Sequence, residues 1–179
     1  MARAEALGPE VATTSYARAC ESPAVEAVYI SLPNDDHLTW VEHALAAGKH
    51  VLCEKPLALS AGQVDRMAAA AAVADRLLVE AAWNRWHPRT RRAEELAAQA
   101  RGPVEATAWF TFPGPPEGNY RLDPARGGGA LLDVGTYAVA AAHWATGADV
   151  LDVVEAQAHH GPTGVDLTTT ATLAAGASR

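Results

Sequence analysis

The chain has 179 residues, of which 49% are hydrophobic and 20% are charged, a balance typical of a folded globular protein. Its 14 Lys and Arg residues against 21 Asp and Glu residues give a net charge of −7, which argues against binding to nucleic acid or to an anionic membrane surface. No apolar run approaches the roughly 18 residues of a membrane span, and Arg3 and Glu5 interrupt the start where a signal peptide needs apolar residues. We therefore predict a cytoplasmic protein.

The first half of the chain alternates strand and helix patterns. Residues 25–33 form a β-branched and aromatic run that stops at a proline, and residues 36–47 have helical apolar spacing closed by Gly48. Residues 50–54 predict a second strand, so strand, helix and strand fit a right-handed βαβ unit. Ser60 begins a helix over 61–74, and 76–81 predict a third strand. This alternation indicates an α/β domain with a parallel sheet.

The pattern changes after Trp83. A charged helix follows over 88–100, then a strand over 104–112 and a loop over 113–119. Three glycines, 127–129, precede a long apolar helix over 130–145. Residues 150–159 and 165–174 alternate Thr and Val like antiparallel strands. We predict domains over 1–82 and 83–179, the second α+β with a mostly antiparallel open sheet, incomplete at the C-terminus.

Neither cysteine points to a metal or a disulfide. Cys20 and Cys53 lie far apart and lack metal-ligand spacing, so we predict two reduced thiols and no metal site.

Lysine occurs only at Lys49 and Lys55. Lys55 lies between Glu54 and Pro56, just past a predicted strand end, where open α/β sheets place their ligand crevice. A solvated loop lysine paired with Glu54 is the alternative.

Four stretches together resemble the Gfo/Idh/MocA oxidoreductases, and the similarity spans about 15–174. They are 26–37, 46–58 with Glu54-Lys55-Pro56, 80–88, and 120–137 with its triple glycine. The pattern is most similar to the branch with glucose-fructose oxidoreductase, sugar dehydrogenases and dihydrodiol dehydrogenase. The resemblance implies a Rossmann-type cofactor domain, a substrate and oligomerisation domain, and hydride transfer between a nicotinamide and a sugar, polyol or cyclic alcohol.

Three residues carry the proton chemistry that this resemblance implies. Tyr137 would give or take the hydroxyl proton, because a lysine ammonium such as that of Lys55 favours the phenolate form of a tyrosine. Asp133 is spaced i, i+4 from Tyr137 and could orient the substrate hydroxyl or Lys55. The alternatives are that Tyr137 packs in a core and that Asp133 only complements a helix dipole.

The resemblance also implies binding residues. Those implied near the cofactor are Leu32, Pro33, Asn34, His37, Glu54, Lys55, Pro56, Glu80 and Arg85, and those implied on the substrate side are Tyr120 and Arg121. His87 before Pro88 could be a site residue or a helix cap, and Tyr120 with Arg121 could be a plain surface loop.

Two features depart from the family pattern. At the N-terminal end the sequence has no Gly-x-Gly-x-x-Gly turn, and residues 2–9 match the end of the helix after the family's second strand. At the C-terminal end the chain stops at residues 175–179, within the larger open sheet of the family's second domain. We therefore expect a chain truncated at both ends, with the first βαβ unit missing. The missing part would select NAD or NADP; the branch favours NADP. The complete protein would be a homo-oligomer. A nicotinamide-dependent lyase or glycosidase and a non-catalytic binding module remain alternative functions.

Overall fold

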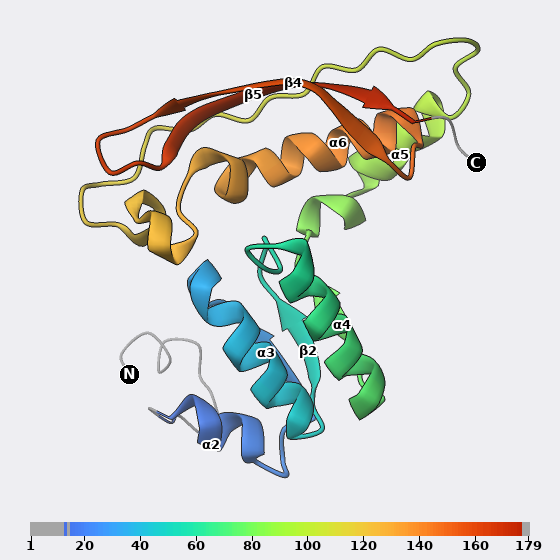
Figure 1. Cartoon of the computed structure of the whole chain (residues 1–179). Helices are drawn as coiled ribbons and strands as arrows, with labels where there is room; N and C mark the ends of the chain where they lie inside the picture. The colour runs from blue at the N-terminus through green and yellow to red at the C-terminus, as the bar shows by residue number, and fades with distance from the viewer. Residues whose placement is uncertain (1–12, 14, 177–179) are drawn as a thin grey trace. The chain divides into compact units, whose positions relative to one another are not determined.

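The computed structural model describes residue 13 and residues 15–176, and its chain divides into two compact units (Figure 1). The first unit comprises Met1–Leu32 and Asp36–Ala81, and the second comprises Pro33–Asp35 and Ala82–Arg179. The helix end predicted at residues 2–9 lies outside the described residues.

A three-stranded parallel sheet forms the centre of the first unit. Its strands are β1 (Ala27–Ile30), β2 (His50–Cys53) and β3 (Leu78–Glu80), in the order β1-β2-β3. Helix α3 (His37–Ala46) connects β1 to β2, and α4 (Ala61–Ala74) connects β2 to β3; α2 (Tyr16–Glu21) precedes the sheet. The predicted parallel α/β arrangement is confirmed.

Local signals in the sequence set the helix ends. The Ser60 hydroxyl accepts a hydrogen bond from the Gln63 N–H at 3.3 Å and so caps α4. Helix α3 ends before Gly48, whose φ of 74° is the left-handed conformation that favours glycine after a helix.

Apolar side chains from the sheet and from α3 and α4 form one closed core. Helices α3 and α4 contact each other, and α3 also contacts β1 and β2. The buried hydrophobic residues of this core are Cys20, Ile30, Val41, Ala44, Leu45, Val51, Cys53, Ala58, Met67 and Ala71.

The larger segment of the second unit, Ala82–Arg179, starts with a short 3₁₀ turn, Trp83–Trp86, followed by α5 (Pro88–Ala97). His87 Nδ1 accepts from the Arg89 N–H at 3.1 Å, so the structure shows His87 as the cap of α5. The strand predicted over 104–112 is wrong: this segment is irregular, and no described strand pairs with it. A strand pattern becomes a strand only where a partner supplies backbone hydrogen bonds.

The predicted long helix over 130–145 exists but starts with a different winding. A π-helical turn, Leu131–Gly135, precedes α6 (Thr136–Thr146), and Gly147 ends α6. The Leu131 N–H donates to Asp166 Oδ2 at 2.8 Å, which anchors this turn to the second sheet. π-Helical turns occur often at functional sites.

Strands β4 (Leu151–His160) and β5 (Asp166–Ala175) form an antiparallel pair, the long orange-red ribbon of Figure 1. The predicted antiparallel sheet is confirmed. Most of its side chains are exposed, including Val153 and Val154.

Candidate functional site

The ends of the parallel strands bring several predicted cofactor residues together in the first unit. Leu32 follows β1, Glu54–Pro56 follow β2, and Glu80 ends β3. Because parallel strands end at the same edge of a sheet, these residues share the edge where open α/β sheets bind ligands.

Two carboxylates at this edge accept hydrogen bonds from other groups of the protein. Glu54 accepts from the Tyr29 hydroxyl at 2.5 Å through Oε1 and from the Lys55 N–H at 3.2 Å through Oε2. The bond to Glu54 raises the pKa of Tyr29 to about 12, since ionisation of the phenol would break it. Glu80 Oε1 accepts from the Leu57 N–H at 2.8 Å. Both carboxylates therefore order the backbone after β2.

His37, the first residue of α3, is completely buried. Its Nδ1 lies 2.9 Å from the Pro56 carbonyl oxygen, and its Nε2 lies 2.9 Å from the Leu32 carbonyl oxygen. The ring therefore contacts two loops of the protein and has no exposed surface for a ligand.

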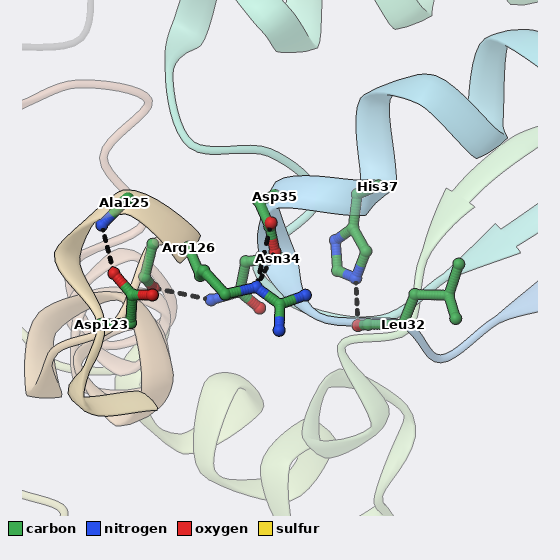
Figure 2. A network of polar contacts seen from close by, with 8 residues as sticks. Leu32, Asn34, Asp35, His37, Asp123, Ala125 and Arg126 are labelled. Atoms are coloured by element: carbon green, nitrogen blue, oxygen red, sulfur yellow. Dashed lines mark hydrogen bonds and ion pairs between the residues drawn. The ribbon is translucent and has the colours of Figure 1, made fainter. Parts of the chain in front are cut away.

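The loop of residues 33–35 is held by residues that the sequence analysis did not single out. The buried Asn34 side chain donates to the Gly127 carbonyl at 2.9 Å, and Arg126 Nε donates to both Asp35 carboxylate oxygens at 3.2 and 3.1 Å (Figure 2). No spacing in the sequence links residue 35 to residue 126, so only the fold reveals this pair.

Tyr137 lies in the first turn of α6, beside two aromatic rings. Trp83 Nε1 donates to the Tyr137 hydroxyl at 3.1 Å, and the Phe110 ring stacks on Tyr137 with centroids 5.2 Å apart. An open hollow of about 580 Å³ borders Tyr137 and is also lined by Arg89 and Trp109. The Trp83 indole therefore orients the Tyr137 oxygen at the edge of this hollow.

Asp133 sits in the π-helical turn and forms an ion pair with Arg121, whose Nε lies 2.9 Å from Oδ2. The Arg121 guanidinium also lies over the Tyr120 ring, 4.8 Å from its centroid. Three predicted site residues, Tyr120, Arg121 and Asp133, therefore form one cluster in the second unit.

Arg85 has a partner away from that cluster. Its Nη1 donates to Glu94 Oε2 at 2.6 Å, and this hydrogen bond raises the pKa of Arg85 and lowers the pKa of Glu94. Both groups are fully charged at neutral pH.

The predicted site residues thus fall in both units, each of which is described by itself. Leu32, His37, Glu54, Lys55, Pro56 and Glu80 belong to the first, and Pro33, Asn34, Arg85, Tyr120, Arg121, Asp133 and Tyr137 to the second. In the described part of the chain, no group of three or more His, Cys, Asp or Glu side chains is arranged to hold a metal ion. None of the described helices has the length and apolar character needed to cross a membrane.

The residues present fit part of a nicotinamide dinucleotide. The strand-end edge offers loop backbone and the Lys55 cation, both suited to a polar anionic ligand. No Gly-x-Gly-x-x-Gly turn, which lets backbone approach a pyrophosphate closely, occurs among the 179 residues. The residues present therefore fit the part of the cofactor other than the pyrophosphate that such a turn would bind.

Known proteins resemble the chain along nearly all of its length. D-xylose 1-dehydrogenase (NADP(+)) 2 of Haloferax volcanii is 43% identical over 141 residues, 78% of this chain and 43% of that protein. Human trans-1,2-dihydrobenzene-1,2-diol dehydrogenase is 33% identical over 160 residues, 89% of this chain and 48% of that protein. The chain thus spans about half the length of these curated relatives.

A solved structure agrees with the sequence relatives. A 3-ketoreductase from Actinomadura kijaniata, in complex with NADP and TDP-benzene, matches with a TM-score of 0.86 and 36% identity, over 96% of this chain and 53% of that chain. Residues 2–81 match an oxidoreductase family model with an NAD-binding Rossmann fold, and residues 90–177 match the GFO/IDH/MocA C-terminal domain. The chain therefore belongs to the Gfo/Idh/MocA family of oxidoreductases.

Proposed function

We propose that this chain carries the nicotinamide-side loops and the proton-transferring tyrosine of an NAD(P)-dependent oxidoreductase. Residues 1–82 would contribute to cofactor binding, and residues 83–179 to substrate binding. The single observation that carries the proposal is the parallel sheet whose strand ends present Leu32, Glu54–Pro56 and Glu80 at one edge, in a chain of this family.

The substrate class follows from chemistry that the relatives' names share. The names of D-xylose 1-dehydrogenase, the dihydrodiol dehydrogenase and the 3-ketoreductase each denote oxidation or reduction at a hydroxyl or keto group. We propose a sugar, polyol or cyclic alcohol, or the matching ketone, as substrate. NADP is the proposed cofactor, as the xylose relative is named for it, and NAD is the alternative, since one solved relative, from gentamicin A biosynthesis, holds NAD.

When bound, the nicotinamide ring accepts or supplies the hydride, so the protein has to manage the proton. In the oxidation direction, the Tyr137 oxygen takes the proton of the substrate hydroxyl as the carbonyl double bond forms, and reduction reverses this step. Trp83 Nε1 donates to the Tyr137 oxygen, and a hydrogen bond of this kind stabilises negative charge on it.

Lys55 and Asp133 have supporting roles in the proposal. The Lys55 ammonium would favour the Tyr137 phenolate, which requires the two groups to approach each other in the working protein. Asp133 holds Arg121, so its proposed role becomes the orientation of this guanidinium toward substrate oxygens. The family's solved structures include a Tyr-to-Phe variant and a Lys-to-Ala variant of the same 3-ketoreductase.

The test compares Tyr137→Phe with Tyr16→Phe, a matched control at an exposed tyrosine of α2. Nicotinamide absorbance would be followed with D-xylose and with cyclic diols, and NADPH affinity would be measured by fluorescence. We expect Tyr137→Phe to lower turnover at least about a hundredfold with little change in NADPH affinity, since general acid–base catalysis contributes about this much. Unchanged turnover would contradict the role of Tyr137.

Two further outcomes separate the alternatives. NADPH binding without turnover of any substrate would favour a non-catalytic binding module. Product formed while the cofactor is recycled would favour a lyase or glycosidase.

A further inference from the structure

One peptide group beside Lys55 is held at both of its polar atoms. The carbonyl oxygen of Pro56 lies 2.9 Å from His37 Nδ1, and the N–H of Leu57 donates to Glu80 Oε1 at 2.8 Å. These two atoms belong to the same Pro56–Leu57 peptide. Its plane is therefore fixed from α3 on one side and from the end of β3 on the other.

The contacts of His37 also reach the neighbouring loop. His37 Nε2 lies 2.9 Å from the Leu32 carbonyl oxygen, shown by the dashed line between the two residues in Figure 2. A neutral imidazole donates through one ring nitrogen and the imidazolium through both, so the ring can satisfy one or both carbonyls. No apolar side chain could do so, and an unpaired buried carbonyl destabilises the fold.

The burial of His37 distinguishes a role in contacting the cofactor from a role in positioning the backbone. Its relative exposure is 0%, so the ring cannot touch a ligand bound at the strand ends, although the sequence suggested a cofactor-binding residue. The carboxylate of Glu80 likewise has a backbone partner. Both side chains act on the backbone that follows Lys55.

We propose that His37 and Glu80 are positioning residues that set the direction of Lys55 through the Pro56–Leu57 peptide. Through its other ring nitrogen, Nε2, His37 separately fixes the position of the loop at Leu32. This inference rests on the proposed function, in which Lys55 acts on the proton chemistry and the two loops contact the cofactor.

Two conservative variants divide the contacts of His37. The amide nitrogen of Asn occupies the place of Nδ1, so His37→Asn keeps a donor for Pro56 and loses the one for Leu32. The amide nitrogen of Gln occupies the place of Nε2, so His37→Gln keeps Leu32 and loses Pro56. For Glu80, Glu80→Gln keeps the acceptor for the Leu57 N–H, and Glu80→Ala removes it.

The primary readout is residue-resolved amide hydrogen exchange on the 179-residue chain, which needs neither cofactor nor turnover. We expect His37→Gln and Glu80→Ala to speed exchange of the Leu57 N–H about tenfold relative to His37→Asn and Glu80→Gln, since each loses one hydrogen bond. Equal exchange at Leu57 in His37→Gln and His37→Asn would overturn the proposal. The exposed Glu80 gives a second route if changes at His37 prevent folding.

Kinetics supply the second readout. His37→Gln should lower kcat by a larger factor than it raises the cofactor KM, and His37→Asn should raise the cofactor KM by a larger factor than it lowers kcat. A general loss of stability would not separate these constants. If the exchange pattern appears but wild-type chain neither binds NADPH nor turns over substrate, the proposed function fails while the positioning of the loop stands.

Discussion

The two units differ in how they bury apolar side chains. The first has a closed core in which Val41, Ala44, Leu45 and Cys53 are at most 1% exposed. In the described part of the second, the buried hydrophobic residues are Ala148 and Val165, while Trp109 is 78% and Val153 is 66% exposed. The first unit is therefore stabilised mainly by its core, whereas local polar contacts carry more of the order in the second.

Substitution of a buried and an exposed leucine by alanine tests this contrast, and it has the largest expected effect on stability. Leu45 in α3 is 1% exposed and Leu96 in α5 is 52% exposed. Leu45→Ala should lower the free energy of unfolding by about 3 kcal/mol through lost burial and a cavity, and Leu96→Ala by less than about 1 kcal/mol. Urea denaturation followed by circular dichroism measures both, and equal losses would remove the contrast.

The second prediction concerns the triple glycine of the second unit. A Cβ at Gly128 would lie 2.5 Å from the Arg121 carbonyl oxygen and 2.8 Å from that of Asp123, and backbone cannot rotate away. We expect Gly128→Ala to destabilise by about 2 kcal/mol. Gly114→Ala, with nothing within 4 Å of its Cβ, is the control. Equal thermal midpoints for the two variants would show that the turn is loose.

The sequence predicted the first unit better than the second for a physical reason. Strand and helix periodicity, the Ser60 cap and Gly48 are local signals, and they placed β1, α3, β2 and α4. The strand expected over 104–112 depended on a partner strand, which no local pattern encodes. Tyr137 and Lys55 were predicted as site residues through motifs of the family, whereas the contacts of His37 and the pair Asp35–Arg126 required the folded chain.

Asn34 should show a smaller effect. Its buried side chain donates to the Gly127 carbonyl, so Asn34→Ala should lower stability by about 1 kcal/mol. Asn34→Asp keeps the size but cannot donate when ionised, and it should be at least as damaging. If Asn34→Asp were harmless in thermal unfolding, the hydrogen bond would contribute nothing.

Ionisation of the Cys53 thiol should not affect stability at neutral pH and should lower it in alkali. Burial raises the pKa of the Cys53 thiol from 9.0 to about 12, so the folded state retains a proton that the unfolded state releases. Stability from the neutral thiol is therefore fully present below about pH 9 and is lost as the pH rises toward about 12. Urea midpoints across this window should fall more steeply for wild type than for Cys53→Ala. Parallel curves would contradict the shift.

A titration of the chain with NADPH, followed by residue-resolved amide NMR shifts, tests whether the cofactor binds at the strand ends. We expect shifts at the strand ends of the first unit, at Leu32, Glu54, Lys55 and Glu80, with β4 and β5 unaffected. Saturation without shifts at these residues, or shifts confined to β4 and β5, would contradict a cofactor site at the strand ends.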